Sequence, residues 1–108
     1  MEMQRHSFSW GYKGTVYLLH FKEPHYHAQH YCGWTQHLSS RIKKHRKGIS
    51  GVALMKAIKE AGIGFKVAKL WRDKDRFFER RLKNLHNSPR LCPICQRDEW
   101  IKYNLGGE

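Results

Sequence analysis

Two short runs of β-branched and aromatic residues, close together in the first third of the chain, constrain the fold most strongly. They cover residues 14–21 (GTVYLLHF) and 30–35 (HYCGWT). Such residues are enriched in strands because their side chains pack well on a pleated surface. The segment between the runs, residues 22–29, contains Pro24 and is expected to form a hairpin loop. We therefore predict two antiparallel strands joined as a hairpin.

The first of these strands is expected to be a central strand of the sheet. Successive side chains of a strand point to opposite faces. In this run one face carries Thr15, Tyr17, Leu19 and Phe21, and the other carries Val16, Leu18 and His20. Because apolar side chains lie on both faces, we expect both to be covered.

The middle of the chain has helical spacing and then returns to a strand pattern. Apolar residues at helical intervals predict one helix over residues 35–47, with Thr35 as its cap, and another over residues 51–61. Residues 65–71 (FKVAKLW) predict a third strand.

A third helix is expected to begin at Asp73 or Asp75 and to end before Pro89. Its apolar stripe consists of Phe78, Leu82 and Leu85. The predicted order is therefore β-β-α-α-β-α. This order indicates an α+β fold with a small three-stranded, largely antiparallel sheet flanked by helices.

The chain has 108 residues, which suits one domain with a modest core. We divide it into an N-terminal arm (residues 1–13), a central domain (14–88) and a C-terminal extension (89–108) that contains a Cys-Pro-Ile-Cys turn. A short helix or strand is expected around Trp100 to Tyr103.

The charge of the chain points to a polyanionic partner. It has 21 Lys and Arg against 9 Asp and Glu, a formal net charge of +12. A strong positive excess favours nucleic acid as the partner.

No long apolar run, signal peptide or lipidation motif is present, so we expect no membrane association and a soluble, cytoplasmic protein. The odd number of cysteines, three, favours reduced thiols.

Several residues together carry a family resemblance. Thr15-Val16-Tyr17 and Tyr31-Cys32-Gly33 lie in the two strand runs, and they are followed in order by Thr35, Leu38, Arg41, His45 and Glu79. In these residues and their spacing the chain resembles the GIY-YIG nuclease family. The resemblance runs from Gly14 to about Asn87. Among the departures from the family signatures, Thr15 stands in place of a glycine and Cys32 in place of an isoleucine.

The resemblance implies a metal-dependent endonuclease that hydrolyses phosphodiester bonds in DNA. Glu79 would hold one Mg²⁺ or Mn²⁺ ion, and Arg41 would grip the scissile phosphate. Tyr17 would be the general base, its pKa lowered by the neighbouring cation and metal. Tyr31 would support Tyr17, and His45 would orient the nucleophile or contact phosphate.

Other roles for these residues stay open at this stage. Glu79 and Lys83 have the spacing of an ordinary surface ion pair on a helix. Arg41 also fits a solvated basic helix. The family commonly has an asparagine well after the glutamate, and Asn84 and Asn87 are the nearest candidates. The expected DNA-binding surface is formed by Lys43, Lys44, Arg46, Lys47, Lys56 and Lys59.

Cys92 and Cys95 have the spacing of half a zinc site. No second pair of cysteines follows, and His86 would still need Cys32 or a distant histidine to complete four ligands. We therefore expect a reduced structural turn and not a zinc site.

Two other functions compete with the nuclease. One is a non-catalytic nucleic-acid-binding module on the same scaffold, and the other is a zinc-stabilised interaction domain. Because no recognition domain is attached, a nuclease that reads a long specific site would need a homodimer or a partner protein.

Overall fold

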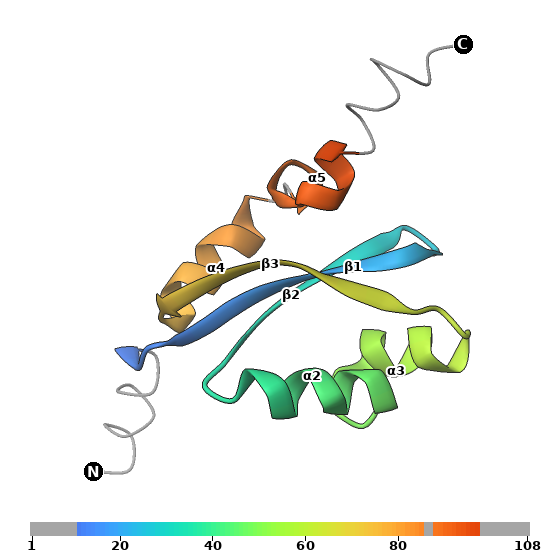
Figure 1. Cartoon of the computed structure of the whole chain (residues 1–108), viewed down its shortest axis with the longest axis horizontal. Coiled ribbons are helices and arrows are strands. Elements are labelled where there is room, and N and C mark those ends of the chain that lie inside the picture. Colours follow the sequence, from blue (N-terminus) through green and yellow to red (C-terminus); the bar gives the residue numbers. More distant parts are fainter. Residues whose placement is uncertain (1–10, 86–87, 98–108) are drawn as a thin grey trace.

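The computed structural model describes residues 11–85 and 88–97, and it confirms the predicted α+β fold class. Three strands form one antiparallel sheet between two helical layers (Figure 1). The elements in chain order are β1 (Gly14–His25), β2 (Ala28–Thr35), α2 (Leu38–Lys47), α3 (Ala53–Glu60), β3 (Phe65–Lys74), α4 (Arg76–Asn84) and α5 (Ser88–Leu91). The predicted order is confirmed, and the short helix α5 follows it.

Strand β1 is the central strand, as predicted. The sheet order is β2-β1-β3, and β1 pairs antiparallel with both neighbours. Leu18 of β1, for example, lies opposite Cys32 on β2 and opposite Lys69 on β3. Strand β1 therefore lies in the middle of the sheet and pairs with both other strands.

The hairpin between β1 and β2 is tighter than predicted. Strand β1 continues to His25 and β2 begins at Ala28, so the long loop predicted over residues 22–29 is wrong. The expectation failed because Pro24 was treated as a strand breaker. In the described part of the chain β1 pairs with β3 only as far as Phe21. Beyond that point a residue without an N–H group is tolerated at the open edge of the strand.

The two faces of the sheet carry separate cores. On one face Tyr17, Leu19 and Phe21 pack against Met55 and Ile58 of α3. Helices α2 and α3 form this layer, and α4 and α5 lie on the other side of the sheet (Figure 1). The second core contains Val16, Leu18, Cys32 and Cys92, with Phe78 and Leu82 of α4 packed against it. The predicted division of β1 into two buried faces is therefore confirmed.

The third residue of the predicted α4 stripe is not buried. Leu85, which follows the last residue of the helix, is 62% exposed. The start of α4 matches the prediction, since the Asp75 side chain accepts a hydrogen bond from the Phe78 N–H.

The start of α2 differs from the prediction. The helix begins at Leu38, with His37 in the cap position. Thr35 does not cap it. The Thr35 hydroxyl oxygen instead accepts a hydrogen bond from the His37 N–H at 3.0 Å, which closes a turn just before the helix.

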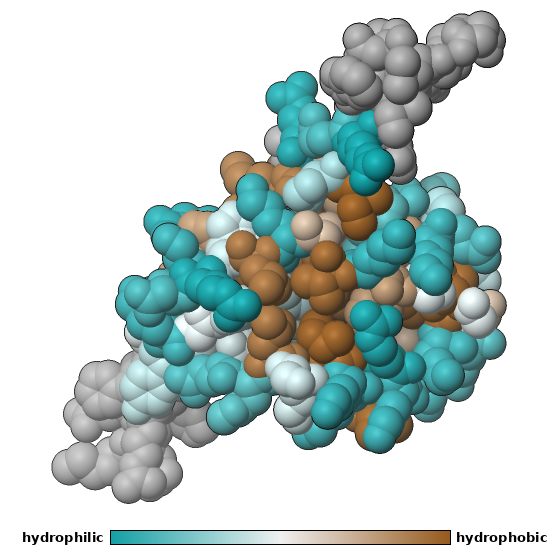
Figure 2. All heavy atoms as spheres, in the orientation of Figure 1, coloured by the Kyte–Doolittle hydropathy of each residue, from teal (hydrophilic) through white to brown (hydrophobic). Residues whose placement is uncertain are grey.

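Apolar residues gather in the middle of the face seen in Figure 2, and hydrophilic residues surround them. Within residues 11–85 and 88–97, no helix is long and apolar enough to cross a membrane. The element predicted around Trp100 to Tyr103, and most of the predicted N-terminal arm, lie outside the described residues.

Candidate active site

The structure brings both tyrosines of the signature runs together with His45 of α2. The Tyr17 hydroxyl lies 2.7 Å from His45 Nε2. The ring centroids of Tyr17 and Tyr31 are 6.2 Å apart, and His45 lies 5.7 Å from the first ring and 5.4 Å from the second. Gly33 lies opposite Tyr17 in the sheet, where a Cβ atom would collide with the phenol. The glycine of the second run is therefore needed to admit this ring.

Arg41 completes the group from one helical turn before His45. Its guanidinium interacts with the phenol groups of both Tyr17 and Tyr31, which raises the arginine pKa despite the opposing effect of burial. It also donates a hydrogen bond from Nη1 to the backbone carbonyl of Ser50 at 3.2 Å. The Ser50 hydroxyl lies 2.7 Å from His45 Nδ1. Ser50 thus holds both functional side chains of α2, although nothing in its sequence context indicated this role.

The pKa of Tyr17 moves in the opposite direction from our expectation. Burial raises it to about 12, and the charges of Tyr31 and Glu79 add to this effect, whereas Arg41 lowers it by less. The charge of Arg41 by itself does not outweigh burial, and the predicted lowering by cation and metal together stays a prediction. Tyr17 has no exposed surface, and a phenolate is costly to form without water around it.

His45 is held in its neutral form. Burial, and secondarily the charge of Arg41, lower its pKa to about 4. The side chain is only 1% exposed. A neutral imidazole can receive a proton at Nε2, so His45 is placed to accept the hydroxyl proton of Tyr17.

This burial predicts a pH dependence of stability. The unfolded chain takes up a proton on His45 near pH 6.5, whereas the folded protein does so only near pH 4. We expect the free energy of unfolding to fall between these values as the pH is lowered, by up to roughly 3 kcal/mol. Urea unfolding at several pH values across this range measures the fall in the free energy of unfolding. This fall should be smaller in His45→Gln than in the parent. His27→Asn, in the exposed hairpin turn, is the control. An equal slope in His45→Gln and the parent would contradict this assignment.

Glu79 reaches this region from the other helical layer. Its side chain is 18% exposed and lies 3.2 Å from Lys83 Nζ, so the predicted i,i+4 ion pair is present. The Lys83 ammonium also lies 5.4 Å from the centre of the Tyr31 ring. The carboxylate also acts electrostatically on Tyr17 and Cys32. Helix α4 therefore places Glu79 beside the strand that carries Tyr31.

A polar hollow of about 450 Å³ adjoins Arg41. It is lined by Thr35, His37, Ser40, Arg41 and Lys44. Two cations and two hydroxyl groups at one hollow are suited to an anion such as phosphate. Arg41 both lines this hollow and interacts with the two phenols, so it links the hollow to the tyrosines.

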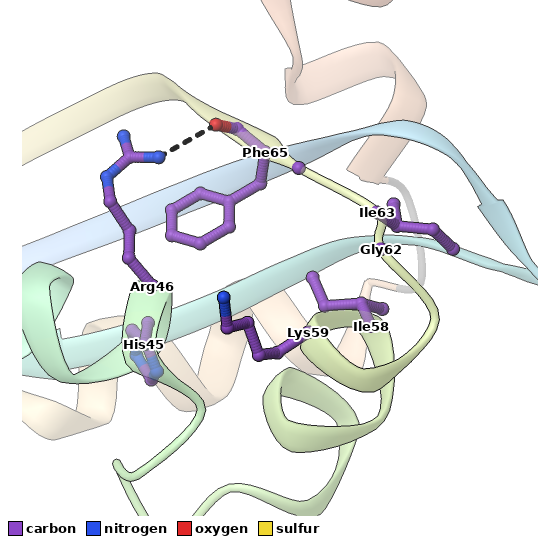
Figure 3. Close-up of a pocket in the computed structure, with 8 residues that line it drawn as sticks. His45, Arg46, Ile58, Lys59, Gly62, Ile63 and Phe65 are labelled. Atoms are coloured by element: carbon purple, nitrogen blue, oxygen red, sulfur yellow. Dashed lines mark hydrogen bonds between the residues drawn. The ribbon is translucent and has the colours of Figure 1, made fainter.

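The residues of the predicted DNA-binding surface are all exposed, on α2 and α3. Lys44 shares the hollow with Arg41. Arg46 and Lys59 instead line a second hollow of about 230 Å³, which His45 also lines (Figure 3). Arg46 stacks over the Phe65 ring at 4.4 Å and donates a hydrogen bond to the Phe65 carbonyl. The Arg46 guanidinium is therefore partly engaged by Phe65, which leaves fewer of its donors for a phosphate.

The remaining sequence candidates lie apart from this group or outside the described residues. Asn84 is exposed at the last position of α4, and Asn87 lies outside the described residues. Cys92 and Cys95 lie on the other face of the sheet, near His20 and His30. Sequence reasoning did not connect these two histidines with the cysteines.

Comparison with known proteins finds no significant match to this chain. No protein-family model matches the chain, and neither a curated protein nor a solved structure matches it significantly.

Proposed function

We propose that this protein is a metal-dependent endonuclease that hydrolyses phosphodiester bonds in DNA. The observation that supports the proposal most strongly is the convergence of Tyr17, Tyr31, Arg41 and His45, with Glu79 close by on another layer. These residues come from four elements, β1, β2, α2 and α4. A purely structural cluster would not need an arginine, a histidine and a carboxylate around two phenols.

Arg41 is the group that grips the phosphate. Its planar fork of donors matches two phosphate oxygens, and its position at the polar hollow leaves room for the anion. Lys44 adds a second positive charge at the same hollow. The net charge of +12 draws DNA toward this surface and holds its backbone there.

Glu79 is the residue that would hold the divalent ion. Its carboxylate is a hard oxygen ligand, and Mg²⁺ needs few such ligands because it keeps most of its waters. Lys83 would have to give up its ion pair with this carboxylate. A bound divalent ion supplies charge stabilisation to the phosphate and the leaving oxygen.

Tyr17 and His45 form the route for the proton. In the protein by itself, moving the Tyr17 proton to His45 is unfavourable by on the order of 10 kcal/mol, given pKa values of about 12 and about 4. A general-base role for Tyr17 therefore requires positive charge beyond that of Arg41. It also requires the buried hydroxyl to become accessible to water when DNA binds. Tyr31, which is half-buried, lies closer to the surface.

The competing function is a non-catalytic nucleic-acid-binding module. The observation that favours it is the Glu79–Lys83 ion pair, which occupies the carboxylate that the enzyme needs for its ion. Both functions require nucleic-acid binding, and only the enzyme cuts DNA. Assays of a panel of linear, nicked, flapped and branched DNAs in Mg²⁺ separate the two and identify the preferred substrate.

Replacement of Arg41 by lysine tests the proposed enzyme. We expect Arg41→Lys to lose most of the cleavage, by on the order of 100-fold, because an ammonium cannot make a two-pronged contact with phosphate. The matched control is Arg72→Lys, the same chemical change at an exposed position on β3, outside the candidate active site. Cleavage rates of both variants are compared with the parent. Turnover near the parental rate in Arg41→Lys would assign Arg41 to the solvated basic face of α2.

DNA affinity should depend strongly on salt and weakly on sequence. Lysine and arginine contacts to phosphate release counterions, so the logarithm of the binding constant falls linearly with the logarithm of salt concentration. Replacing exposed Lys56 and Lys59 by glutamine should lower that slope by roughly one for each contact removed. Fluorescence anisotropy at several salt concentrations measures this. Binding that does not change with salt would exclude the proposed surface.

A further inference from the structure

We propose that His20, His30, Cys92 and Cys95 bind one zinc ion, which fastens the C-terminal segment of the chain to the sheet. The four ligand atoms lie within 4.8 Å of one another. This site is separate from the proposed nuclease site and does not depend on it, since His20 is on the opposite face of β1 from Tyr17.

The ligands come from two parts of the chain that the fold brings together. His20 on β1 lies directly opposite His30 on β2. Cys92 follows α5, and Cys95 lies in the helical turn formed by residues 93–97. Two ligands therefore belong to the hairpin and two to the C-terminal segment, so one ion would join them.

The distances between ligand atoms fit a tetrahedral zinc ion. Zn–N bonds of about 2.0 Å and Zn–S bonds of about 2.3 Å at tetrahedral angles place two nitrogens about 3.3 Å apart, and a nitrogen and a sulfur about 3.5 Å apart. His20 Nδ1 and His30 Nε2 are 3.3 Å apart. Three of the four nitrogen–sulfur distances are 3.4 Å for Cys92 to His20, 3.5 Å for Cys95 to His20, and 3.3 Å for Cys95 to His30.

Hydrogen bonds alone do not explain this arrangement. His20 Nδ1 has three close neighbours: His30 Nε2 and the sulfurs of Cys92 and Cys95. An imidazole nitrogen offers either one proton or one lone pair, so it cannot satisfy three partners at once. A cation at the centre accepts one lone pair from each of the four atoms, and every ligand is then satisfied.

The types of ligand favour zinc as the metal, and their number favours a structural role for it. Two thiolates and two imidazoles in a tetrahedron are a donor set that zinc prefers, whereas Mg²⁺ and Mn²⁺ prefer oxygen. Protein atoms fill all four corners, which leaves no position for a reacting water. Cys92 has no exposed surface, and His20 is 7% exposed. The Cys95 N–H also donates to the Cys92 sulfur at 3.5 Å, which stabilises a thiolate there.

Elemental analysis of the purified full-length chain tests the proposal. We expect one zinc ion per chain in protein prepared without chelator. Replacement by Co²⁺ should give the visible absorption of a tetrahedral ion together with a thiolate charge-transfer band. Cys95→Ser should lose zinc, since it removes one ligand at a half-buried position. The matched control is Cys32→Ala, a buried cysteine outside the cluster, which should keep zinc.

A second measurement avoids the risk that a variant does not fold. In the parent protein, alkylation should spare Cys92 and Cys95 until a strong chelator is added, and mass spectrometry of peptides then locates the labels. Each of three results would overturn the proposal: substoichiometric zinc in protein made with zinc supplied, full zinc retention by Cys95→Ser, or a Cys92–Cys95 disulfide in freshly prepared protein. None of these measurements involves DNA, so their failure is distinguishable from failure of the nuclease proposal.

Discussion

Glu79→Gln should give a folded protein that binds DNA at least as tightly as the parent and does not cleave it. Glutamine keeps the shape and the helix propensity of glutamate, but it removes the negative charge that a hard divalent ion needs. The loss of one repulsive charge near the basic surface should, if anything, strengthen binding. Loss of the Lys83 ion pair should cost only a few tenths of a kcal/mol of stability.

The matched control for this variant is Glu60→Gln. Glu60 is an exposed residue at the end of α3, and its replacement removes the same charge. It should bind DNA like Glu79→Gln and cleave like the parent. Cleavage rates in Mg²⁺ and in Mn²⁺, together with circular dichroism and binding isotherms, provide the comparison. If Glu79→Gln cut DNA at the parental rate, Glu79 would be only the helical partner of Lys83.

The second large effect is expected from Cys92→Ser combined with Cys95→Ser. Because the free energy of binding a structural metal is part of the free energy of folding, the double variant should lose at least about 3 kcal/mol. For a domain of this size that corresponds to a fall in Tm of roughly 10–20 °C. Cys92 also belongs to the buried core beside Val16 and Leu18.

Thermal unfolding with and without added zinc measures this effect. Zinc should raise the Tm of metal-depleted parent protein and should leave that of the double variant unchanged. The cleavage rate per folded molecule should stay close to the parental value, because the cysteines lie on the opposite face of the sheet from Tyr17. A double variant that melts like the parent would argue against the structural role.

The strands and helices could be predicted because each leaves a local pattern in the sequence. The alternation along β1, with Tyr17 and Leu19 on one face and Val16 and Leu18 on the other, corresponds directly to the two cores of the structure. The loop between β1 and β2 could not be predicted from Pro24 alone. Whether proline breaks a strand depends on which strand lies beside it, and that is a property of the whole sheet.

The candidate active site was predictable as a set of residues but not in its electrostatics. The order and spacing of Tyr17, Tyr31, Arg41 and His45 are visible in the sequence, and the structure brings these residues together. Whether the pKa of Tyr17 is raised or lowered depends on how completely the packed core buries that ring. Ser50 gives no local signal, since its partners depend on the packing of the α2–α3 loop.

The zinc ligands illustrate a different limit. His20 and His30 lie opposite each other only because of the β1–β2 register, which cannot be read from the sequence. One histidine on each strand of a hairpin, followed later by a Cys-x-x-Cys sequence, is the signal that could have connected all four residues.

The most direct test of the proposed function is incubation of supercoiled circular DNA with the purified chain in Mg²⁺ or Mn²⁺. The proposal predicts conversion to nicked circles and then to linear DNA, abolished by chelation of the divalent ion and absent from Glu79→Gln prepared in parallel. Intact supercoiled DNA after incubation with folded, DNA-binding parent protein in either metal would contradict it, and so would cleavage of equal rate by Glu79→Gln.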